Sequence, residues 1–279
     1  MSNEITNLDN LSSDKIMSFI GQDASVDPKL AKLSINKQSE DDAGNKLQVG
    51  TFRLDGTTAG TIIGKPILFR PLLTTYQYKK YDEDSEENNY KSVMFTSWTD
   101  PIPDTNGTQK CGSIPKADRD KLDPIEKLEQ NKITCYKHTW GLATMKGVSP
   151  EGKELSVTDE PVLYTARGTN FLPIVEVLRS LSKRGKIMYN SIIEFYDTEK
   201  QTKGSNTWYI GKIKDTFKHA DFTDQDKETL KGFLEIVKSE NDYVLSEHNA
   251  KHKAKSEVLD DDIVAVSYTH LTLPTIYSV

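Results

Sequence analysis

The sequence lacks most of the features that would assign a chemistry or a compartment directly. Its 279 residues include two cysteines, Cys111 and Cys135, enough for one disulfide at most. No apolar run approaches the roughly 18 residues that a membrane-spanning helix requires. The first 21 residues include the acidic Glu4, Asp9 and Asp14, whereas a signal peptide would be basic there. We therefore expect a cytoplasmic protein with reduced thiols and no membrane partner.

The sequence signatures of several common enzyme classes are also missing. The chain contains no HExxH, no G-x-S-x-G and no G-x-G-x-x-G motif. Its acidic residues lie in charge runs such as DEDSEE, which are typical of solvated surfaces, so no carboxylate pair for acid and base catalysis stands out. We expect the protein not to be an enzyme.

Three residues have the chemistry of metal ligands. Cys111, Cys135 and His138 offer the thiolate and imidazole groups that Zn²⁺ prefers, but a structural zinc site takes four ligands. His219 is a candidate for the fourth. We expect no cofactor, and zinc at these residues is the alternative to two small buried thiols.

Charge is absent from the last fourteen residues, VSYTHLTLPTIYSV, although 28% of the chain is charged. The stretch from Val266 to Thr275 resembles a translated sequencing-library adapter. We therefore expect residues 266–279 to be non-native and the gene to have been cut near Ala265. The alternative is a natural β-rich tail, because Thr, Leu, Ile and Tyr are common in strands.

The remaining charge is distributed unevenly along the chain. Residues 1–50 carry five Lys against eight acidic residues, and residues 221–265 carry six Lys against twelve. Because the whole chain has a net charge of −6, residues 51–220 have a net charge of +3. A mildly basic middle therefore lies between two acidic ends.

The middle of the chain has the composition and pattern of a β domain. Eight short segments rich in Ile, Val, Thr, Tyr and Phe alternate with Gly, Asn, Asp and Pro clusters from Gln48 onward. We predict a β-rich α+β fold, an OB-like barrel with helical insertions and a C-terminal helix. The predicted parts are a polar N-terminal arm with a short helix (1–47), the OB-like domain (48–220), a packing helix (221–247), an acidic tail (248–265) and the adapter-derived tail (266–279).

Local signals mark three of the expected helices. Asp123 precedes Pro124 as an N-cap, and Gly185 is placed to end a helix that starts near residue 171. Thr223 and Asp226 have the spacing of a capping box. The helix that follows them carries an apolar stripe, predicted to pack on the barrel, of Leu230, Phe233, Leu234 and Val237.

Aromatic residues alternate with cations along the expected strands. Tyr76 and Tyr78 share one face of a strand with Lys80, as Tyr136 shares a face with Trp140. Proteins that bind single strands stack bases on such rings and follow the phosphates with Lys and Arg, although β cores also need aromatics. The candidate stacking residues are Tyr76, Tyr78, Trp98, Tyr136, Trp140 and Trp208. The candidate phosphate contacts are Arg70, Lys79, Lys80, Lys137, Arg167, Lys183, Arg184 and Lys186.

In layout the chain resembles phage-type single-stranded-DNA-binding proteins. The resemblance rests on the basic aromatic strands, on the acidic stretch EVLDDDIV, and on two segments similar to tailed-phage proteins, LSINKQSEDDAGNKLQVGTF and TARGTNFLPIVEVLRSLSKRGKIM. It implies an OB-like barrel that protects single-stranded DNA in phage replication or recombination, in the cytoplasm of the infected cell. It also implies an acidic C-terminal tail that contacts replication or recombination proteins.

Two other classes of protein stay open from the sequence. A β-rich phage virion or assembly protein would use the aromatics as core and the acidic ends for solubility. A metal-dependent nuclease would need two or three carboxylates brought within metal-bridging distance by the fold.

Overall fold

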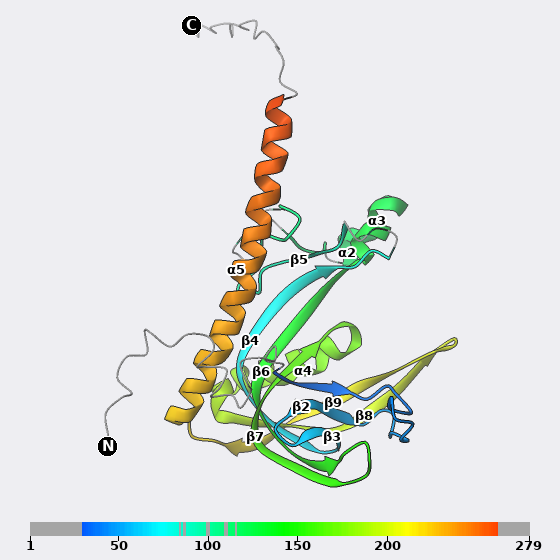
Figure 1. The fold of residues 1–279 in the computed structure, drawn as a ribbon, viewed down its shortest axis with the longest axis vertical. Helices are drawn as coiled ribbons and strands as arrows, with labels where there is room; N and C mark the ends of the chain where they lie inside the picture. The colour runs from blue at the N-terminus through cyan, green and yellow to red at the C-terminus, as the bar shows by residue number, and fades with distance from the viewer. Residues whose placement is uncertain are drawn as a thin grey trace, which may run out of the picture.

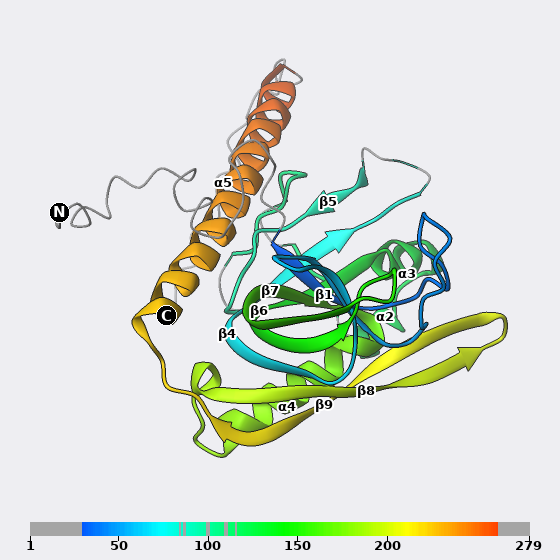
Figure 2. The same ribbon diagram turned by 60° about the horizontal axis from the view of Figure 1, so that its bottom comes forward.

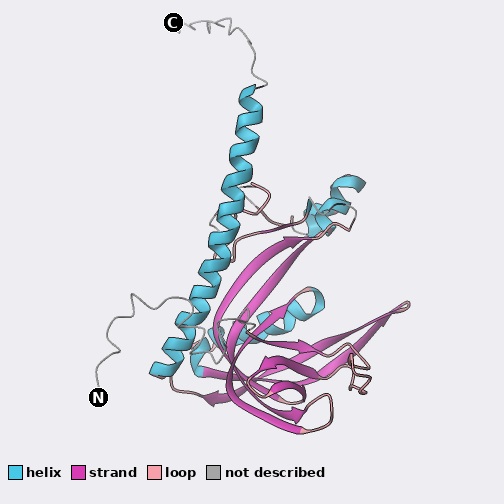
Figure 3. Cartoon of the chain, in the orientation of Figure 1, coloured by secondary structure: helices cyan, strands magenta, loops and turns pink. Residues whose placement is uncertain are grey.

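The structure is a computed structural model that describes residues 30–261, apart from residues 84, 86, 87, 99, 100, 109, 110 and 115. A mixed sheet of nine strands forms its body, and a long helix runs along one side (Figures 1 and 3). The strands are β1 (Ala31–Ile35), β2 (Phe52–Thr57), β3 (Gly60–Gly64), β4 (Ile67–Lys80), β5 (Tyr90–Lys91), β6 (Ile133–Val148), β7 (Glu154–Ala166), β8 (Ser191–Lys203) and β9 (Asn206–His219). The helices are α2 (Lys116–Arg119), α3 (Pro124–Asn131), α4 (Phe171–Lys183) and α5 (Asp224–Asp261), with short 3₁₀ turns η3 (Gly168–Asn170) and η4 (Met188–Asn190).

Neighbouring strands pair in the order β3-β2-β1-β7-β6-β4-β8-β9, and β5 pairs with β4. A further pairing of Ile63 in β3 with Val148 in β6 joins β1, β2, β3, β6 and β7 into a closed circuit. Within it β1 and β7 are parallel, and the other neighbours are antiparallel. The prediction of a strand-rich α+β fold is confirmed, whereas these pairings do not confirm an OB-like barrel.

The predicted N-terminal arm is wrong for the residues after position 30. β1 lies inside the sheet between β2 and β7, and its Ala31 and Leu33 are buried in the core. Leu47 is buried as well. The short helix expected earlier in the arm lies outside the described residues, as do residues 262–279 with the adapter-like segment.

The main core lies within the strand circuit and under α4. The ring of Phe195 makes edge contacts with three other aromatic rings, at centroid distances of 5.6 Å to Phe52, 5.8 Å to Phe69 and 4.9 Å to Tyr164. Ile174 and Leu181 of α4 are buried in the same cluster. α4 is thereby fixed against the sheet, with its other faces available for a site.

Two pairs of long strands extend from this core. β4 and β6 pair along almost their whole length and form a curved ribbon, and β8 and β9 form a long hairpin that passes beside α4 (Figures 1 and 2). Register shifts interrupt the β8–β9 pairing at two places, between Ser191 and Ile193 and between Phe195 and Asp197. Such bulges change the direction of the side chains that they contain.

The local helix signals are confirmed. Asp123 Oδ1 accepts hydrogen bonds from the N–H groups of Ile125 and Glu126 at 2.8 and 3.0 Å. Gly185 follows α4 with φ +68°, a left-handed conformation that glycine adopts without a Cβ clash. Thr223 and Asp226 form the capping box, with the Thr223 N–H donating to Asp226 Oδ2 at 2.7 Å.

α5 is longer than the sequence indicated. It continues to Asp261, so the predicted boundary at residue 247 between helix and tail is wrong. Phe233 and Val244 lie on the face of α5 that packs against the rest of the protein, and both are buried. Leu234 of the predicted stripe lies beside that face and is exposed. In the described part of the chain, no helix combines the length and apolar character needed to span a bilayer.

Candidate nucleic-acid interface

The predicted aromatic strands present their rings on two opposite faces of the β4–β6 ribbon. Directly paired residues of antiparallel strands share a face. Tyr76 pairs with Lys137 and therefore shares its face, whereas Tyr136 pairs with Gln77 on the other one. The candidate rings of β4 and β6 consequently cannot form a single stacking surface.

The face that carries Trp140 is covered by α5. The indole is 2% exposed, and its centroid lies 5.7 Å from the ring of Phe233. His138 beside it is also buried, and its Nδ1 lies 3.0 Å from Thr165 Oγ1. Burial, assisted by the charge of Lys79, lowers the pKa of His138 to about 4. Trp140 is therefore a core residue and His138 is neutral at physiological pH, so the predicted stacking role of Trp140 is wrong.

Tyr136 lies on the same face as Trp140 but closer to the end of the ribbon. Its hydroxyl accepts a hydrogen bond of 2.9 Å from Arg167 Nη1, and Lys79 Nζ lies 5.3 Å from the ring centre. His138 stacks nearly parallel to the ring, at 6.3 Å and 10°. Because three side chains already surround it, this ring is poorly placed to stack on a base, although Arg167 itself is exposed.

On the opposite face, rings from three segments form an aromatic cluster next to the start of α4. Trp98 lies 4.8 Å from Tyr76 and 5.0 Å from Phe95, and Phe171 of α4 lies 6.1 Å from Tyr76. Tyr78 is buried beneath, stacked on Phe95 at 5.6 Å. Trp98 is 53% exposed, so it is the predicted aromatic best placed to meet a base.

Lys137 supports this aromatic cluster from below. Its Nζ donates a hydrogen bond of 3.1 Å to Tyr76 Oη and lies 4.1 Å from the centre of that ring. The side chain is 4% exposed, and burial lowers the pKa of Lys137 to about 8. Lys137 therefore stiffens the cluster and is not accessible to phosphate, contrary to the prediction.

Two of the predicted phosphate contacts are occupied in ion pairs that fix helices. Arg70 is paired with Asp226 at the start of α5, with both side chains largely buried, and it donates to the Asp221 carbonyl at 3.0 Å. Lys80 forms a 2.7 Å ion pair with Glu129 of α3. Both cations act in the fold, because moving them to a phosphate would break these contacts.

The C-terminal end of α4 brings two other predicted cations together with an exposed phenylalanine. Arg184 and Lys186 form ion pairs with Asp215 at 2.9 and 3.0 Å, and both cations lie 4.9 Å from the ring centre of Phe217. We call these four residues the Phe217 clamp. Lys183, one residue before Arg184, is exposed and has no ion-pair partner within the described part of the chain.

The backbone of the clamp is unusual. Phe217 has φ +61°, and its side chain is 72% exposed. It lies in the first β8–β9 irregularity, where three residues of β9 oppose one of β8. A bulky residue at positive φ is strained, and strained backbone is concentrated at functional sites. The strain here presents a ring to solvent.

Asp215 organises the clamp electrostatically. Its side chain is nearly buried, and Oδ1 accepts a 2.8 Å hydrogen bond from the N–H of Phe217. Burial raises the pKa of the Asp215 carboxyl, but this hydrogen bond and the charges of Lys186 and Arg184 outweigh it, so the pKa is lowered overall. With one carboxylate against two cations, the clamp keeps a net charge of +1.

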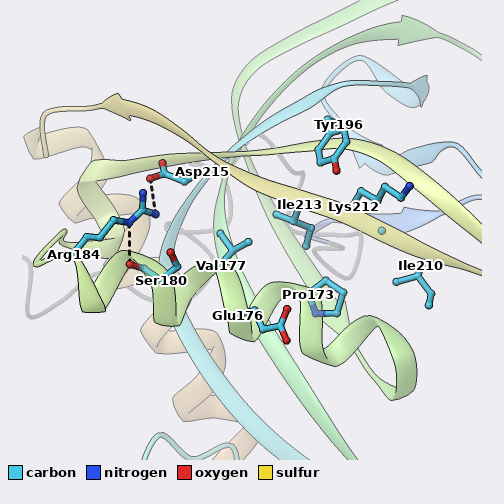
Figure 4. A pocket seen from close by; sticks show the side chains of 11 residues that line it. Pro173, Glu176, Val177, Ser180, Arg184, Tyr196, Ile210, Lys212, Ile213 and Asp215 are labelled. Carbon is cyan, nitrogen blue, oxygen red and sulfur yellow. Dashed lines mark hydrogen bonds and ion pairs between the residues drawn. The ribbon is translucent and has the colours of Figure 1, made fainter.

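The second bulge of the hairpin presents another ring. Tyr196 is the extra residue of β8 between Phe195 and Asp197, it is 39% exposed, and Lys214 Nζ lies 4.8 Å from its ring centre. It lines an open groove of about 440 Å³ between α4 and β9, whose other end includes Arg184 and Asp215 (Figure 4). The groove thus extends from Tyr196, which is paired with Lys214, to Arg184 and Asp215 of the Phe217 clamp.

Sequence reasoning did not identify Phe217 or Tyr196. The segment KDTFK (214–218) could have indicated Phe217, because it places a phenylalanine near two lysines, as in the other aromatic and basic segments. Trp208, which was identified, lies near the tip of the hairpin, where it is half-buried and its Nε1 has no partner among the described residues.

The candidate zinc ligands are not brought together. Cys135 and His138 are three residues apart in regularly paired β6, so their side chains lie on opposite faces of the ribbon. Cys111 is buried near Tyr90, and burial raises the pKa of its thiol to about 12. Within the described ranges, no three or more His, Cys, Asp or Glu residues are grouped closely enough to hold a metal ion.

Comparison with known proteins gives no family for this chain. No protein-family model, no curated protein and no solved structure matches it.

Proposed function

We propose that this protein binds single-stranded DNA on the side of the molecule formed by α4. The observation that supports it best is the Phe217 clamp, an exposed ring with Arg184 and Lys186 each 4.9 Å from its centre. Proteins that bind single strands combine rings, which stack on bases, with cations that follow the phosphates. The Phe217 clamp offers a ring and two cations that contact each other.

A purely structural role does not account for the clamp. A ring that is mostly exposed contributes little apolar burial, and a positive φ at a phenylalanine has a free-energy cost of about 1–3 kcal/mol. Asp215 would pair with Arg184 and Lys186 whatever residue stood at position 217. A ligand that stacks on the ring would account for both its exposure and its strain.

α4 connects the Phe217 clamp to the aromatic cluster around Trp98. From Phe171, which touches that cluster, to Arg184 the helix rises roughly 20 Å at 1.5 Å per residue. Arg179 is exposed on the way, and its charge reaches Tyr76, where it lowers the pKa that burial raises. We propose that a strand follows α4, with bases on Trp98 and Phe217 and phosphates near Arg179, Lys183 and Arg184.

The proposal also covers the process, the compartment and the protein partners of this binding. We propose action in phage replication or recombination, without catalysis, in the cytoplasm of the infected cell. The acidic residues after Glu247 are proposed to contact replication or recombination proteins. Binding along α4 does not require the OB-like barrel, which stays a prediction.

One observation favours a second candidate function, that of a β-rich assembly protein. Ile125 and Leu128 of α3 are both exposed, and so is Tyr81 at the same end of the ribbon, where its N–H donates to the Lys132 carbonyl. Exposed apolar groups of this kind are typical of protein–protein contacts. This function predicts co-purification with virus particles and no salt-dependent affinity for DNA.

A titration of labelled oligo-dT tests the proposal. The probe has about 15 nucleotides, near the largest site known for one single-strand-binding domain. We expect the fluorescence anisotropy to rise with protein concentration, and the affinity to fall between about 50 mM and about 200 mM salt because phosphate contacts release counterions. A duplex of equal length should bind more weakly. The absence of binding at low salt would reject this function.

A further inference from the structure

β9 lies at the edge of the sheet, where a side chain already imitates a neighbouring strand. It pairs with β8 and with no other strand of the described structure. Asn170, directly before α4, donates from Nδ2 to the Tyr209 carbonyl at 2.9 Å, and its Oδ1 accepts from the Gly211 N–H at 2.8 Å. A donor and an acceptor of one amide thus meet an acceptor and a donor of β9, as the backbone of an adjacent strand would. The free edge of β9 therefore faces the start of α4.

The groove between α4 and β9 continues along this edge. The extra residue of the nearby bulge, Tyr196, belongs to β8, so the alternation along β9 is not interrupted. Ile213 consequently directs its N–H and C=O to the same side as Gly211. Among the residues that the structure describes, these two groups and the Gly211 carbonyl have no hydrogen-bond partner on that side. The groove of about 440 Å³ opens beside them, with Pro173 and Val177 of α4 lining its other wall (Figure 4).

We infer that this groove binds an extended peptide segment of a protein partner, which pairs with the free edge of β9 as a further strand. Unpaired strand edges bind extended chains in this way, with the affinity supplied by backbone hydrogen bonds. A nucleic acid does not match the same groups, because its sugar–phosphate backbone offers acceptors but no N–H donors. The groove follows β9 from Gly211 to Asp215, roughly 13 Å of strand, so the bound segment is about four residues long.

The side chains around the groove indicate which peptide fits. Lys212 and Lys214 are two residues apart and share one face of β9, where each is partly exposed and paired on the β8 side with one glutamate. An acidic side chain on an added strand would lie beside them. On the α4 side, Pro173 and Val177 are apolar and Glu176 would repel an acid. The best segment therefore alternates apolar and acidic residues.

The test titrates a labelled, end-blocked hexapeptide of alternating valine and glutamate against the whole protein, without DNA. We expect the fluorescence anisotropy to rise with protein concentration. Two N-methylated forms, one blocked at the valine amides and one at the glutamate amides, each disable one edge of the peptide. One of them should bind at least about tenfold more weakly than the other, because only one edge pairs with β9.

A substitution and an exchange measurement locate the peptide. Ser180→Trp fills the groove from an exposed position of α4 and should weaken binding about tenfold, whereas Ser182→Trp, exposed outside the groove, should bind like the wild type. Saturating peptide should slow hydrogen exchange of the Ile213 amide at least tenfold and leave that of Gly204, at the hairpin tip, unchanged.

The possible results are independent of those for single-stranded DNA. If the hexapeptide does not bind, or if its two methylated forms bind equally, strand addition at β9 is rejected. Binding that survives Ser180→Trp or leaves Ile213 exchange unchanged rejects the groove as its site. Since no probe here is a nucleic acid, either failure leaves the proposed function intact, and a failure of oligo-dT to bind leaves this inference intact.

Discussion

Arg184 lies over the ring of Phe217, with 4.9 Å between the guanidinium carbon and the ring centre. The contact links the C-terminal end of α4 to an irregularity of the β8–β9 hairpin. It also places a cation beside one of the most exposed large apolar side chains of the described structure. The proposed function depends on this pair, because it assigns base stacking to Phe217 and a phosphate contact to Arg184.

Trp140→Ala tests whether this residue belongs to the core. Its indole is almost fully buried against Phe233 of α5. We expect the free energy of unfolding to fall by about 3–5 kcal/mol, as for other buried aromatics that are truncated. Chemical denaturation measures the loss. A stable variant that had lost only its DNA affinity would show that Trp140 is a stacking residue after all.

Lys137→Met tests the buried ammonium below Tyr76. Burial lowers the pKa of Lys137 from 10.5 to about 8, so below pH 8 the native state holds a charge that it disfavours. At pH 7 we expect the Met variant to be more stable by about 1–2 kcal/mol. The wild type should regain stability as the pH rises from 8 to 10.5, because there its unfolded state binds more protons than the native state.

The pH dependence separates this effect from simple changes in packing. Lys183→Met removes an exposed lysine and should leave the stability difference from wild type constant across the same pH range. Melting temperatures at a series of pH values give the comparison. A Lys137→Met variant whose advantage did not shrink above pH 8 would contradict the lowered pKa.

Asp215→Asn tests the electrostatic centre of the Phe217 clamp. The pKa of Asp215 is lowered in the native state from an ordinary value of 3.8, so its stabilising effect is present above that pH and is lost as the pH falls through the native pKa. Near neutral pH the variant should be less stable by about 2 kcal/mol, as expected for hydrogen bonds to a charged group.

At strongly acidic pH the wild type and Asp215→Asn should converge in stability. Asp118→Asn, at an exposed carboxylate paired with Lys121 on the surface, should change stability by less than about 1 kcal/mol at any pH. Thermal melts between pH 2 and pH 7 measure both. A difference for Asp215→Asn that persisted unchanged at the lowest pH would show that the substitution acts through packing and not through the charge.

Local chemistry predicted the helix starts well. Asp123 and the Thr223–Asp226 capping box act within a few residues, so their signals are complete in the sequence. The placement of β1 could not be predicted in this way, since Leu33 pairs with Tyr164 in a parallel ladder more than a hundred residues away. A polar loop follows β1 and gives this part of the chain the composition of an arm.

The candidate site also depends on long-range strand pairing, which local sequence signals do not specify. Period-two spacing correctly grouped Tyr76 with Tyr78, but the register that places Tyr76 and Tyr136 on opposite faces depends on how two distant strands pair. Phe217 reaches the surface through an irregularity in pairing, which no local pattern specifies. Lys183, Arg184 and Lys186 were identified from charge alone, and Phe217, the ring that Arg184 and Lys186 contact, was not.

The central claim is tested most directly by titrating labelled oligo-dT against the wild type, Phe217→Ala and Tyr243→Ala. Tyr243 is the matched control, an exposed ring of α5 with Lys91 Nζ 4.5 Å from its centre. We predict that Phe217→Ala weakens binding by about tenfold or more, as the loss of one base stack does, with an unchanged melting temperature, and that Tyr243→Ala binds like the wild type. Equal affinity of Phe217→Ala and wild type, or equal losses in both variants, would contradict the proposed role of the Phe217 clamp.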